Sequence, residues 1–205
     1  MTEEELKDVK EFTRLYLSYG EDDGYTDRKL ELINESESLG QMLLLINKGD
    51  VLSYLNSLHT TKLVSEQEIA NRLFHQWTTL EKFHNSGMSK SKMLKFMKMA
   101  DKSDGYGAVY NDEVPKVIAV YRGTNVENHK GLSWTRDKEV AEWFAKRFLN
   151  EGQFGYVFSG QLAREDVIAN FTSRNEAEII CDWKKVKDIQ CEKMIKTCNE
   201  IYKFR

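Results

Sequence analysis

The sequence predicts an α+β protein whose first half is helical and whose second half forms a sheet. In residues 1–101 apolar side chains recur at every third or fourth position, the spacing of an amphipathic helix. In residues 102–205 short β-branched and aromatic runs alternate with glycine-containing turns, as in strands. With 40% hydrophobic residues, 31% charged residues and one proline in 205, the chain is not disordered, collagen-like or of low complexity. We expect a mainly helical region over 1–101 and an α+β core over 102–205, packed as one compact unit.

Four or five helices are expected in the first half. The two clearest apolar stripes are Leu6, Val9, Phe12, Tyr16 and Tyr19, and Ile69, Leu73, Trp77, Leu80 and Phe83. Thr2 with Glu5, and Ser65 with Glu68, match the capping box that satisfies N–H groups at the start of a helix. Glycines able to end a helix stand at Gly20, Gly49 and Gly87.

Strands dominate the second half. We expect them at 117–121, 131–135, 155–162, 177–183 and 186–194. One helix interrupts them, because Asp137 is a suitable N-cap. Its apolar stripe is Val140, Ala141, Phe144, Ala145 and Phe148. This order of short strands around one helix indicates a compact sheet domain.

Composition limits the classes of partner and site. The net charge is -3, with 12 acidic against 5 basic residues in 1–40 and 21 against 25 afterwards, so a polyanionic partner is permitted but not demanded. The longest apolar run, 42–46, is too short for a membrane span and the start is acidic, so we expect a cytoplasmic protein without membrane contact. Three cysteines and four histidines show no disulfide or metal-ligand spacing, so we expect free thiols and no metal.

Two features of the sheet half suit ligand binding. Arg122 follows an apolar strand and precedes Gly123, so a guanidinium that can fork onto a phosphate stands beside a backbone that a ligand can approach. Ser133 and Thr135 alternate across Trp134, which in a strand puts both hydroxyls on one face and the indole on the other. Each feature alone is ordinary surface or strand chemistry.

A pair of carboxylates is the third feature. Glu176 and Glu178 are expected on one face at the start of a strand that continues into Ile179. Two like charges so close raise the proton affinity of at least one of them unless a cation or hydroxyl intervenes. Such pairs suit acid/base work or the stabilisation of a cation.

Together and in this order, the residues resemble the ADP-ribosyltransferase superfamily. The similarity is to the branch with an arginine, then a Ser-x-Ser/Thr strand, then a Glu-x-Glu strand, with 43 residues from Thr135 to Glu178. It covers about 115–190, and the helical half contributes no motif. The resemblance implies an NAD-binding cleft split between two small sheets, and transfer of ADP-ribose from NAD to a nucleophile with release of nicotinamide.

The resemblance also implies roles for individual residues. Arg122 would hold an NAD phosphate, the backbone of Gly123 would meet the nicotinamide amide, and Ser133 would brace the cleft. Glu178 would be the catalytic glutamate, whose carboxylate stabilises the positive charge that develops as the glycosidic bond breaks. Glu176 would orient or deprotonate the acceptor, often an arginine side chain in families with Glu-x-Glu.

Four further residues are candidates for binding. Thr135 joins the NAD-binding set, and Trp143 is the aromatic candidate for stacking on nicotinamide. The segment 170–175 would by position recognise the acceptor, with Phe171 and Arg174 stacking on it or pairing with it.

The acceptor and the partners stay open. The leading hypothesis is a mono-ADP-ribosyltransferase that modifies a macromolecule, a bacterial or phage effector or toxin acting in the cytoplasm of the producing or host cell. The alternatives are modification of RNA or DNA bases, NAD hydrolysis, and a non-catalytic binding module. An inhibitor or antitoxin could bind the helical half, although no sequence feature shows one. Five lysines in 88–102 form a basic helical face that could lie on RNA, DNA or an acidic partner, although a solvated face is the favoured interpretation.

Overall fold

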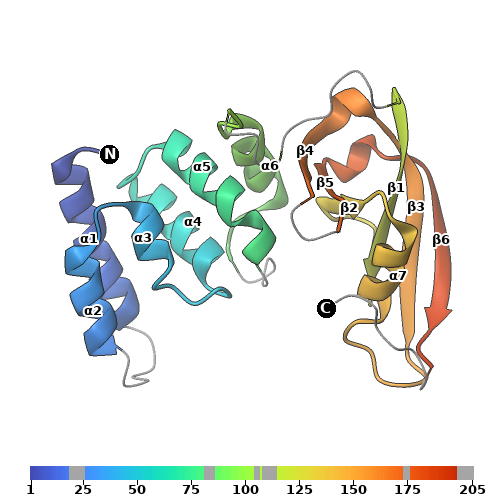
Figure 1. Cartoon of the computed structure of the whole chain (residues 1–205), viewed down its shortest axis with the longest axis horizontal. Coiled ribbons are helices and arrows are strands. Elements are labelled where there is room, and N and C mark those ends of the chain that lie inside the picture. The colour runs from blue at the N-terminus through green and yellow to red at the C-terminus, as the bar shows by residue number, and fades with distance from the viewer. Residues whose placement is uncertain (19–25, 81–85, 104–106, 108–114, 173–175, 198–205) are drawn as a thin grey trace. The chain divides into compact units, whose positions relative to one another are not determined.

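The chain divides into two compact units, Met1–Asp101 and Lys102–Arg205. The computed structural model describes residues 1–18, 26–80, 86–103, 107, 115–172 and 176–197. Within these residues there are seven α-helices and one six-stranded antiparallel sheet, so the predicted α+β class is confirmed (Figure 1).

The first unit is helical in its described part. Its elements are α1 Glu3–Ser18, α2 Thr26–Glu35, α3 Leu39–Leu43, α4 Val51–Thr61, α5 Glu66–Gln76, the 3-10 turn η1 Trp77–Thr79, and α6 Lys90–Met99. The described residues therefore contain six α-helices where four or five were expected. The five-residue α3 is too short for a periodic stripe to reveal, and it begins where Ser38 accepts the backbone N–H of Gln41.

The helix starts were predicted better than the helix ends. Thr2 and Glu5 form the full capping box, with N–H···O distances of 2.7 and 3.2 Å. Ser65 accepts from the N–H of Glu68 at 3.2 Å. The Glu68 carboxylate accepts from Arg72 Nε and not from the backbone N–H of Ser65, so the capping box is incomplete.

The glycine stops were mostly wrong. α4 ends at Thr61, and its C-cap residue Lys62 adopts a left-handed φ of 57°. Gly49 precedes α4, and Gly87 lies between η1 and α6. Gly20 is outside the described residues.

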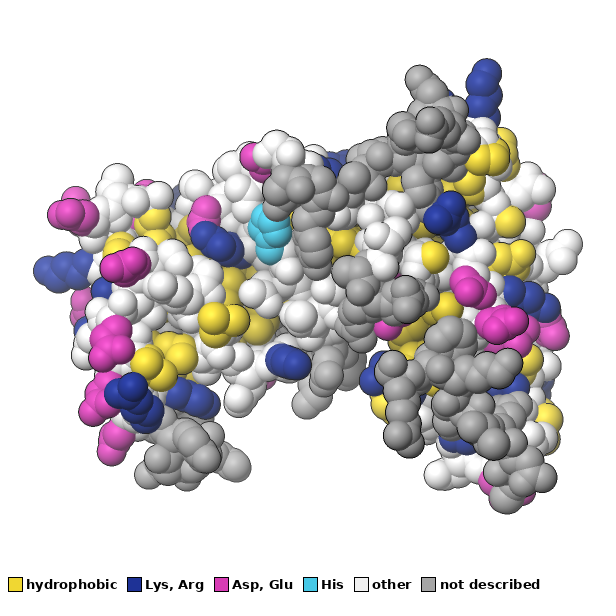
Figure 2. Space-filling model, in the orientation of Figure 1, with side chains coloured by type: hydrophobic (Ala, Val, Ile, Leu, Met, Phe, Trp, Pro, Cys, Tyr) yellow, Lys and Arg dark blue, Asp and Glu magenta, His cyan; other side chains and the backbone are white. Residues whose placement is uncertain are grey.

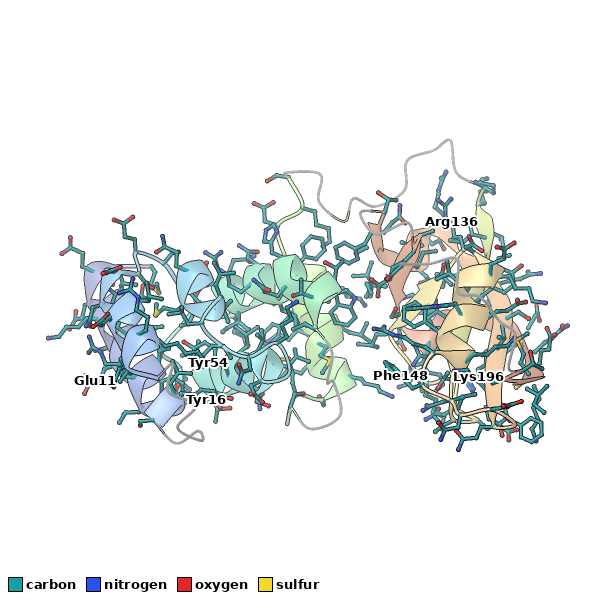
Figure 3. All side chains as sticks on the ribbon, turned by 60° about the horizontal axis from the view of Figure 1, so that its bottom comes forward. Glu11, Tyr16, Tyr54, Arg136, Phe148 and Lys196 are labelled. Carbon is teal, nitrogen blue, oxygen red and sulfur yellow. The ribbon has the colours of Figure 1, made fainter. Side chains whose placement is uncertain are left out.

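A buried polar contact ties α1 to α4. The Thr13 hydroxyl donates to the Val9 carbonyl at 2.6 Å and also shares a hydrogen bond of 2.6 Å with the Tyr54 hydroxyl. Burial raises the pKa of Tyr54 to about 12, although the bond to Thr13 opposes the rise. Tyr16 lies edge-on to Tyr54 with ring centroids 5.1 Å apart (Figure 3). We interpret this contact as part of the structural core of the first unit and not as a catalytic site.

The second unit is built on the sheet. Its strands are β1 Val117–Thr124, β2 Ser133–Thr135, β3 Phe154–Ala163, β4 Val167–Phe171, β5 Glu178–Cys181 and β6 Lys187–Ile195. Their order in the sheet is β4-β5-β2-β1-β3-β6, and every neighbouring pair is antiparallel. Each of the five expected strands is present, whereas β4 was missed because its five residues overlap the segment taken as a loop.

One face of the sheet carries helix α7, Lys138–Lys146 (Figure 1). Asp137 caps it as expected, accepting from the N–H of Glu139 at 2.8 Å. The helix lies so close to β1 that a Cβ on Gly123 would overlap the carbonyl oxygen of Ala141. Phe148 does not belong to the helical stripe, since α7 ends before it and its side chain is 74% exposed.

The other face of the sheet carries the core. Its buried members are Ile118, Val120, Trp134, Phe158, Leu162, Val167, Ile179, Cys181 and Val186. Trp134 faces the core, on the side opposite to the Ser133 and Thr135 hydroxyls as the alternation predicted. Its indole N–H donates to the Gly131 carbonyl at 3.1 Å.

Acidic and basic side chains are interspersed over α1 and α2 on the face seen in Figure 2. Among the described residues no helix is long and apolar enough to cross a membrane.

Candidate active site

The sheet is nearly divided between β1 and β2. β1 pairs with β3 over eight residues, but with β2 only at Tyr121 and Thr135. The six strands therefore form two three-stranded halves, β4-β5-β2 and β1-β3-β6, which one register pair joins. The resemblance implied two small sheets, whereas the structure has one six-stranded sheet.

The hydrogen-bond alternation shows which backbone groups face this separation. Cys181 donates its N–H to the Leu132 carbonyl at 3.0 Å, so the polar groups of Leu132 face β5. Along a strand, the backbone N–H and C=O of successive residues point alternately toward the two neighbouring strands. The N–H and C=O of Ser133 and Thr135 therefore face β1. Tyr121 pairs with Thr135, so the backbone N–H and C=O of Tyr121 face β2. Those of Gly123, two residues further along β1, face β2 as well. The ladder does not continue from Tyr121 to Gly123, so the Gly123 peptide lies where the strands separate.

Arg122 fills part of this separation. Its Nη1 donates to the Ser133 carbonyl at 2.7 Å, and its guanidinium lies against Gly131, where a Cβ would overlap it. Nε is buried and has no hydrogen-bond partner among the described residues. Burial lowers the pKa of Arg122, and the negative charge of Glu178, or of Cys181 when its thiol is ionised, opposes this shift. Arg122 thus positions β2, whereas the sequence had suggested that its guanidinium would bind a phosphate.

Ser133 and Glu178 form the central contact of the site. The Ser133 hydroxyl donates to Glu178 Oε1 at 2.5 Å. Glu178 pairs in register with Thr135, so the three side chains share the face that carries α7. Both Ser133 and Glu178 are half-buried. A carboxylate is therefore held in one orientation by a short hydrogen bond while remaining open to a ligand.

Thr135 does not match its expected role, and Glu176 does not have the position that strand alternation predicted. Thr135 is 6% exposed, its hydroxyl donates to the Glu176 carbonyl at 2.6 Å, and the N–H of Asp137 donates to it at 3.0 Å. It fixes the backbone before β5 and is not available to NAD. Ala177 has a φ of 42°, a left-handed conformation that is costly for a residue with a Cβ. Because the strand begins only at Glu178, alternation does not place Glu176 on the face of Glu178.

Cys181 lies beside the site without being reactive. It is fully buried at the end of β5. Burial raises the pKa of its thiol to about 12, with smaller contributions from Asp182 and Asp166 and an opposing one from Arg122. The thiol stays protonated near neutral pH, so it is not a nucleophile.

The remaining candidates are the aromatic residue Trp143 and the acceptor residues Phe171 and Arg174, and Phe171 is the register partner of Glu178. Trp143 is half-buried on α7, edge-on to Phe144 at 4.8 Å and with the Arg147 guanidinium 4.9 Å from its ring. Phe171 is 2% exposed in β4, so the expectation that it contacts an acceptor is wrong. Arg174 lies outside the described residues.

The basic helix predicted over 88–102 exists as α6, but two of its lysines have partners in the same unit. Lys92 donates to Asn56 at 2.9 Å, and Lys95 pairs with Glu66 at 2.6 Å. These contacts reduce the charge that α6 can offer to a nucleic acid.

Two structural roles at the site were not predicted from the sequence. Gly131 makes room for the Arg122 guanidinium, and Thr135 holds the segment that leads into β5. Only the positions of Gly131 in a predicted strand and of Thr135 near Ser133 hinted at these roles. In the described part of the chain, no group of three or more His, Cys, Asp and Glu side chains could hold a metal ion.

Comparisons with family models, with curated proteins and with solved structures find no match. What the chain does is therefore inferred from the residues at the strand separation.

Proposed function

We propose that the chain is a mono-ADP-ribosyltransferase with an ADP-ribosyltransferase-like core, and that NAD is its substrate. The observation that carries the proposal is the 2.5 Å hydrogen bond from Ser133 to Glu178 where β1 and β2 separate. A carboxylate fixed in this way, with an arginine behind it, is the arrangement that stabilises a cationic sugar in a transition state.

The proposed reaction exchanges one bond for another. The bond between the nicotinamide nitrogen and ribose C1′ breaks, and its electron pair leaves with nicotinamide. A bond then forms between C1′ and a nucleophilic atom of the acceptor, which loses a proton. Glu178 stabilises the positive charge at the ribose during this exchange.

Several groups at the strand separation fit NAD. The backbone N–H and C=O of Gly123 face β2 and can meet the nicotinamide carboxamide, which has both a donor and an acceptor. Ser133 orients the Glu178 carboxylate. Arg122 holds the Ser133 carbonyl, and its charge lies close enough to interact with that of Glu178. In this proposal Arg122 is a positioning residue.

Glu176 is the proposed base for the acceptor. It is half-buried, and its backbone is fixed by Thr135 two residues before Glu178. If the acceptor is a side chain that must lose a proton, Glu176→Gln abolishes transfer and leaves nicotinamide release in place. An NAD glycohydrolase would lose little activity in this variant.

The proposal is tested by following labelled ADP-ribose. Purified protein is incubated with NAD labelled in its adenosine part and with whole-cell extract, and nicotinamide release is measured in parallel. Samples are then digested with nuclease or with protease. Glu178→Gln is the inactive variant, and Glu127→Gln, an exposed glutamate in the loop before β2, is the matched control.

Macromolecular label that Glu178→Gln abolishes and Glu127→Gln preserves would support the proposal, and the digestions would identify the acceptor class. Nicotinamide release without macromolecular label would favour a glycohydrolase. No release by any of the proteins would contradict the proposal and leave a non-catalytic binding module.

A further inference from the structure

Strand β6 forms an uncovered edge of the sheet. It pairs with β3 alone, and Figure 1 shows it at the edge of the second unit. Seven of its nine residues are exposed. At the opposite edge β4 is almost wholly buried, and the N–H of its Asn170 donates to the Gly107 carbonyl at 3.4 Å. An exposed edge strand is a template on which another strand can pair.

The backbone groups of three β6 residues point away from β3. Lys196, directly after β6, donates its N–H to the Gln153 carbonyl at 3.0 Å, so its N–H and C=O face the side of β3. These groups alternate along a strand, so those of Ile195, Lys193 and Cys191 point outward. Within the described ranges of the chain, no hydrogen bond reaches these outward groups. The edge therefore offers both donors and acceptors to a second strand.

A bulge limits this edge near the start of β6. The register with β3 is regular from Gln190 to Ile195. It shifts before Gln190, where Asp188 has a left-handed φ of 52°. Bulges of this kind twist an edge away from new partners. The part of β6 that can accept a second strand therefore begins at Ile189.

We propose that β6 pairs antiparallel with β6 of a second copy of this chain. A two-fold axis perpendicular to the sheet brings the same edge of both copies together in opposite directions, and two-fold dimers are the commonest homo-oligomers. This axis also keeps each face of the sheet continuous, so residues that lie opposite each other have their side chains on the same face. Main-chain hydrogen bonds hold the copies together, as in other cases of strand addition.

The charges of β6 favour one alignment of the two copies. With Cys191 on the axis, Glu192 lies opposite Gln190 of the other copy. Lys193 then lies opposite Ile189, where its methylene stem can pack on an apolar side chain. No like charges face each other among these residues, so this part of β6 pairs with itself without repulsion.

The neighbouring alignments bring like charges together. With Glu192 or Lys193 on the axis, that side chain lies opposite its own copy. With Gln190 on the axis, Asp188 lies opposite Glu192. Like charges directly opposite each other destabilise a strand pair. We therefore place Cys191, whose side chain is exposed, on the two-fold axis.

This dimer directs both candidate active sites to the same face. α7 and the Glu178 side chain share one face of the sheet, and the axis continues that face across the two copies. Three strands separate β5, which carries Glu178, from β6. The pairing therefore does not depend on the proposed chemistry, and it can be tested without NAD.

The first test measures the oligomeric state of the full chain. Sedimentation velocity is recorded at several protein concentrations from about 1 to about 300 µM. Small interfaces are weak, so we expect a monomer–dimer equilibrium with a dissociation constant on the order of 10–100 µM. Lys193→Pro removes an N–H that points outward and not toward β3, so it should raise this constant at least about tenfold. Lys193→Ala is the matched control, because it keeps the N–H, and it should dimerise as the parent chain does.

The second test locates the axis by a disulfide. In Cys198→Ser, the remaining thiols are Cys191 and the buried Cys181. Diamide takes two electrons and two protons from a pair of thiols and leaves a disulfide. Partial burial, with a smaller contribution from Glu127, raises the pKa of the Cys191 thiol, so the reaction is run at about pH 9. We expect a covalent dimer that a reducing agent separates.

A shifted cysteine is the control for this reaction. The variant with Cys191→Ser, Cys198→Ser and Lys193→Cys carries its exposed thiol two residues from the axis. The two thiols then lie four residues apart along the paired strands, about 13 Å, which is too far for a disulfide. It should form covalent dimers at least about tenfold more slowly than Cys191 does. This comparison involves no proline, so it holds even if Lys193→Pro does not fold.

Each result decides the proposal. A chain that stays monomeric at about 300 µM would overturn it, as would a folded Lys193→Pro that dimerises like the parent chain. Covalent dimers that form equally fast through residues 191 and 193 would overturn the alignment. Folding of every variant is checked by circular dichroism. Nicotinamide release by a monomeric chain would overturn the pairing and leave the transferase in place, whereas a dimer without nicotinamide release would do the reverse.

Discussion

Removal of one hydroxyl should disable the site without unfolding the protein. In Ser133→Ala the carboxylate of Glu178 loses its 2.5 Å hydrogen bond. Hydrogen bonds to charged groups contribute about 1.5–3 kcal/mol, so nicotinamide release should fall roughly 10- to 100-fold in kcat/KM. Stability should change by less than about 1 kcal/mol, since Ser133 is half-buried and water can solvate the carboxylate.

The assay combines chromatography of nicotinamide with urea unfolding. Ser159→Ala is the matched control, because Ser159 is also a half-buried serine in the sheet and makes no hydrogen bond through its side chain within the described residues. It should leave activity unchanged. Ser133→Thr keeps a hydroxyl and should retain part of the activity. If Ser133→Ala were as active as the parent chain while Glu178→Gln were inactive, Ser133 would not orient the glutamate and the reasoning would be refuted.

Three further predictions separate position, packing and ionisation. Gly131→Ala should lower the free energy of unfolding in urea by less than about 1 kcal/mol, because the flexible end of Arg122 can move away from the new Cβ. It should nevertheless reduce nicotinamide release, because Arg122 then no longer positions β2. Activity equal to that of the parent chain would contradict this role of Arg122. Gly123→Ala should lower the free energy of unfolding by about 3 kcal/mol, because its Cβ meets the backbone of α7, and an unchanged stability would show that this contact is loose. Burial raises the pKa of Tyr54 from 10.0 to about 12, so the folded state keeps a proton that the unfolded chain loses. The stability that this residue contributes should be full below pH 10 and should fall by about 2 kcal/mol by pH 12. Tyr54→Phe should lack this loss in urea titrations at each pH.

The class of fold was predictable because the two halves have different periodicities. The alternation across Trp134 also predicted correctly that the indole and the Ser133 hydroxyl would lie on opposite faces of the strand. Such patterns depend on local geometry alone, since each side chain follows from the period of its own strand.

Other features depend on contacts between distant segments, and no local pattern reveals them. Thr135 looked free to bind a ligand, but its partner is a carbonyl 41 residues away. The left-handed Ala177 ends the alternation that was applied to Glu176. Phe171 looked like a loop residue, and its burial follows from the pairing of β4 with β5. Tertiary pairing decided each of these cases.

The central claim is that NAD binds where β1 and β2 separate. It is tested most directly by titrating NAD into the isotopically labelled Glu178→Gln variant and following backbone amide resonances. Millimolar NAD should shift the amide resonances of Gly123 and Ser133 first and should leave that of Ser159 on β3 unaffected. Saturable shifts confined to other residues, or no shifts at all, would contradict it.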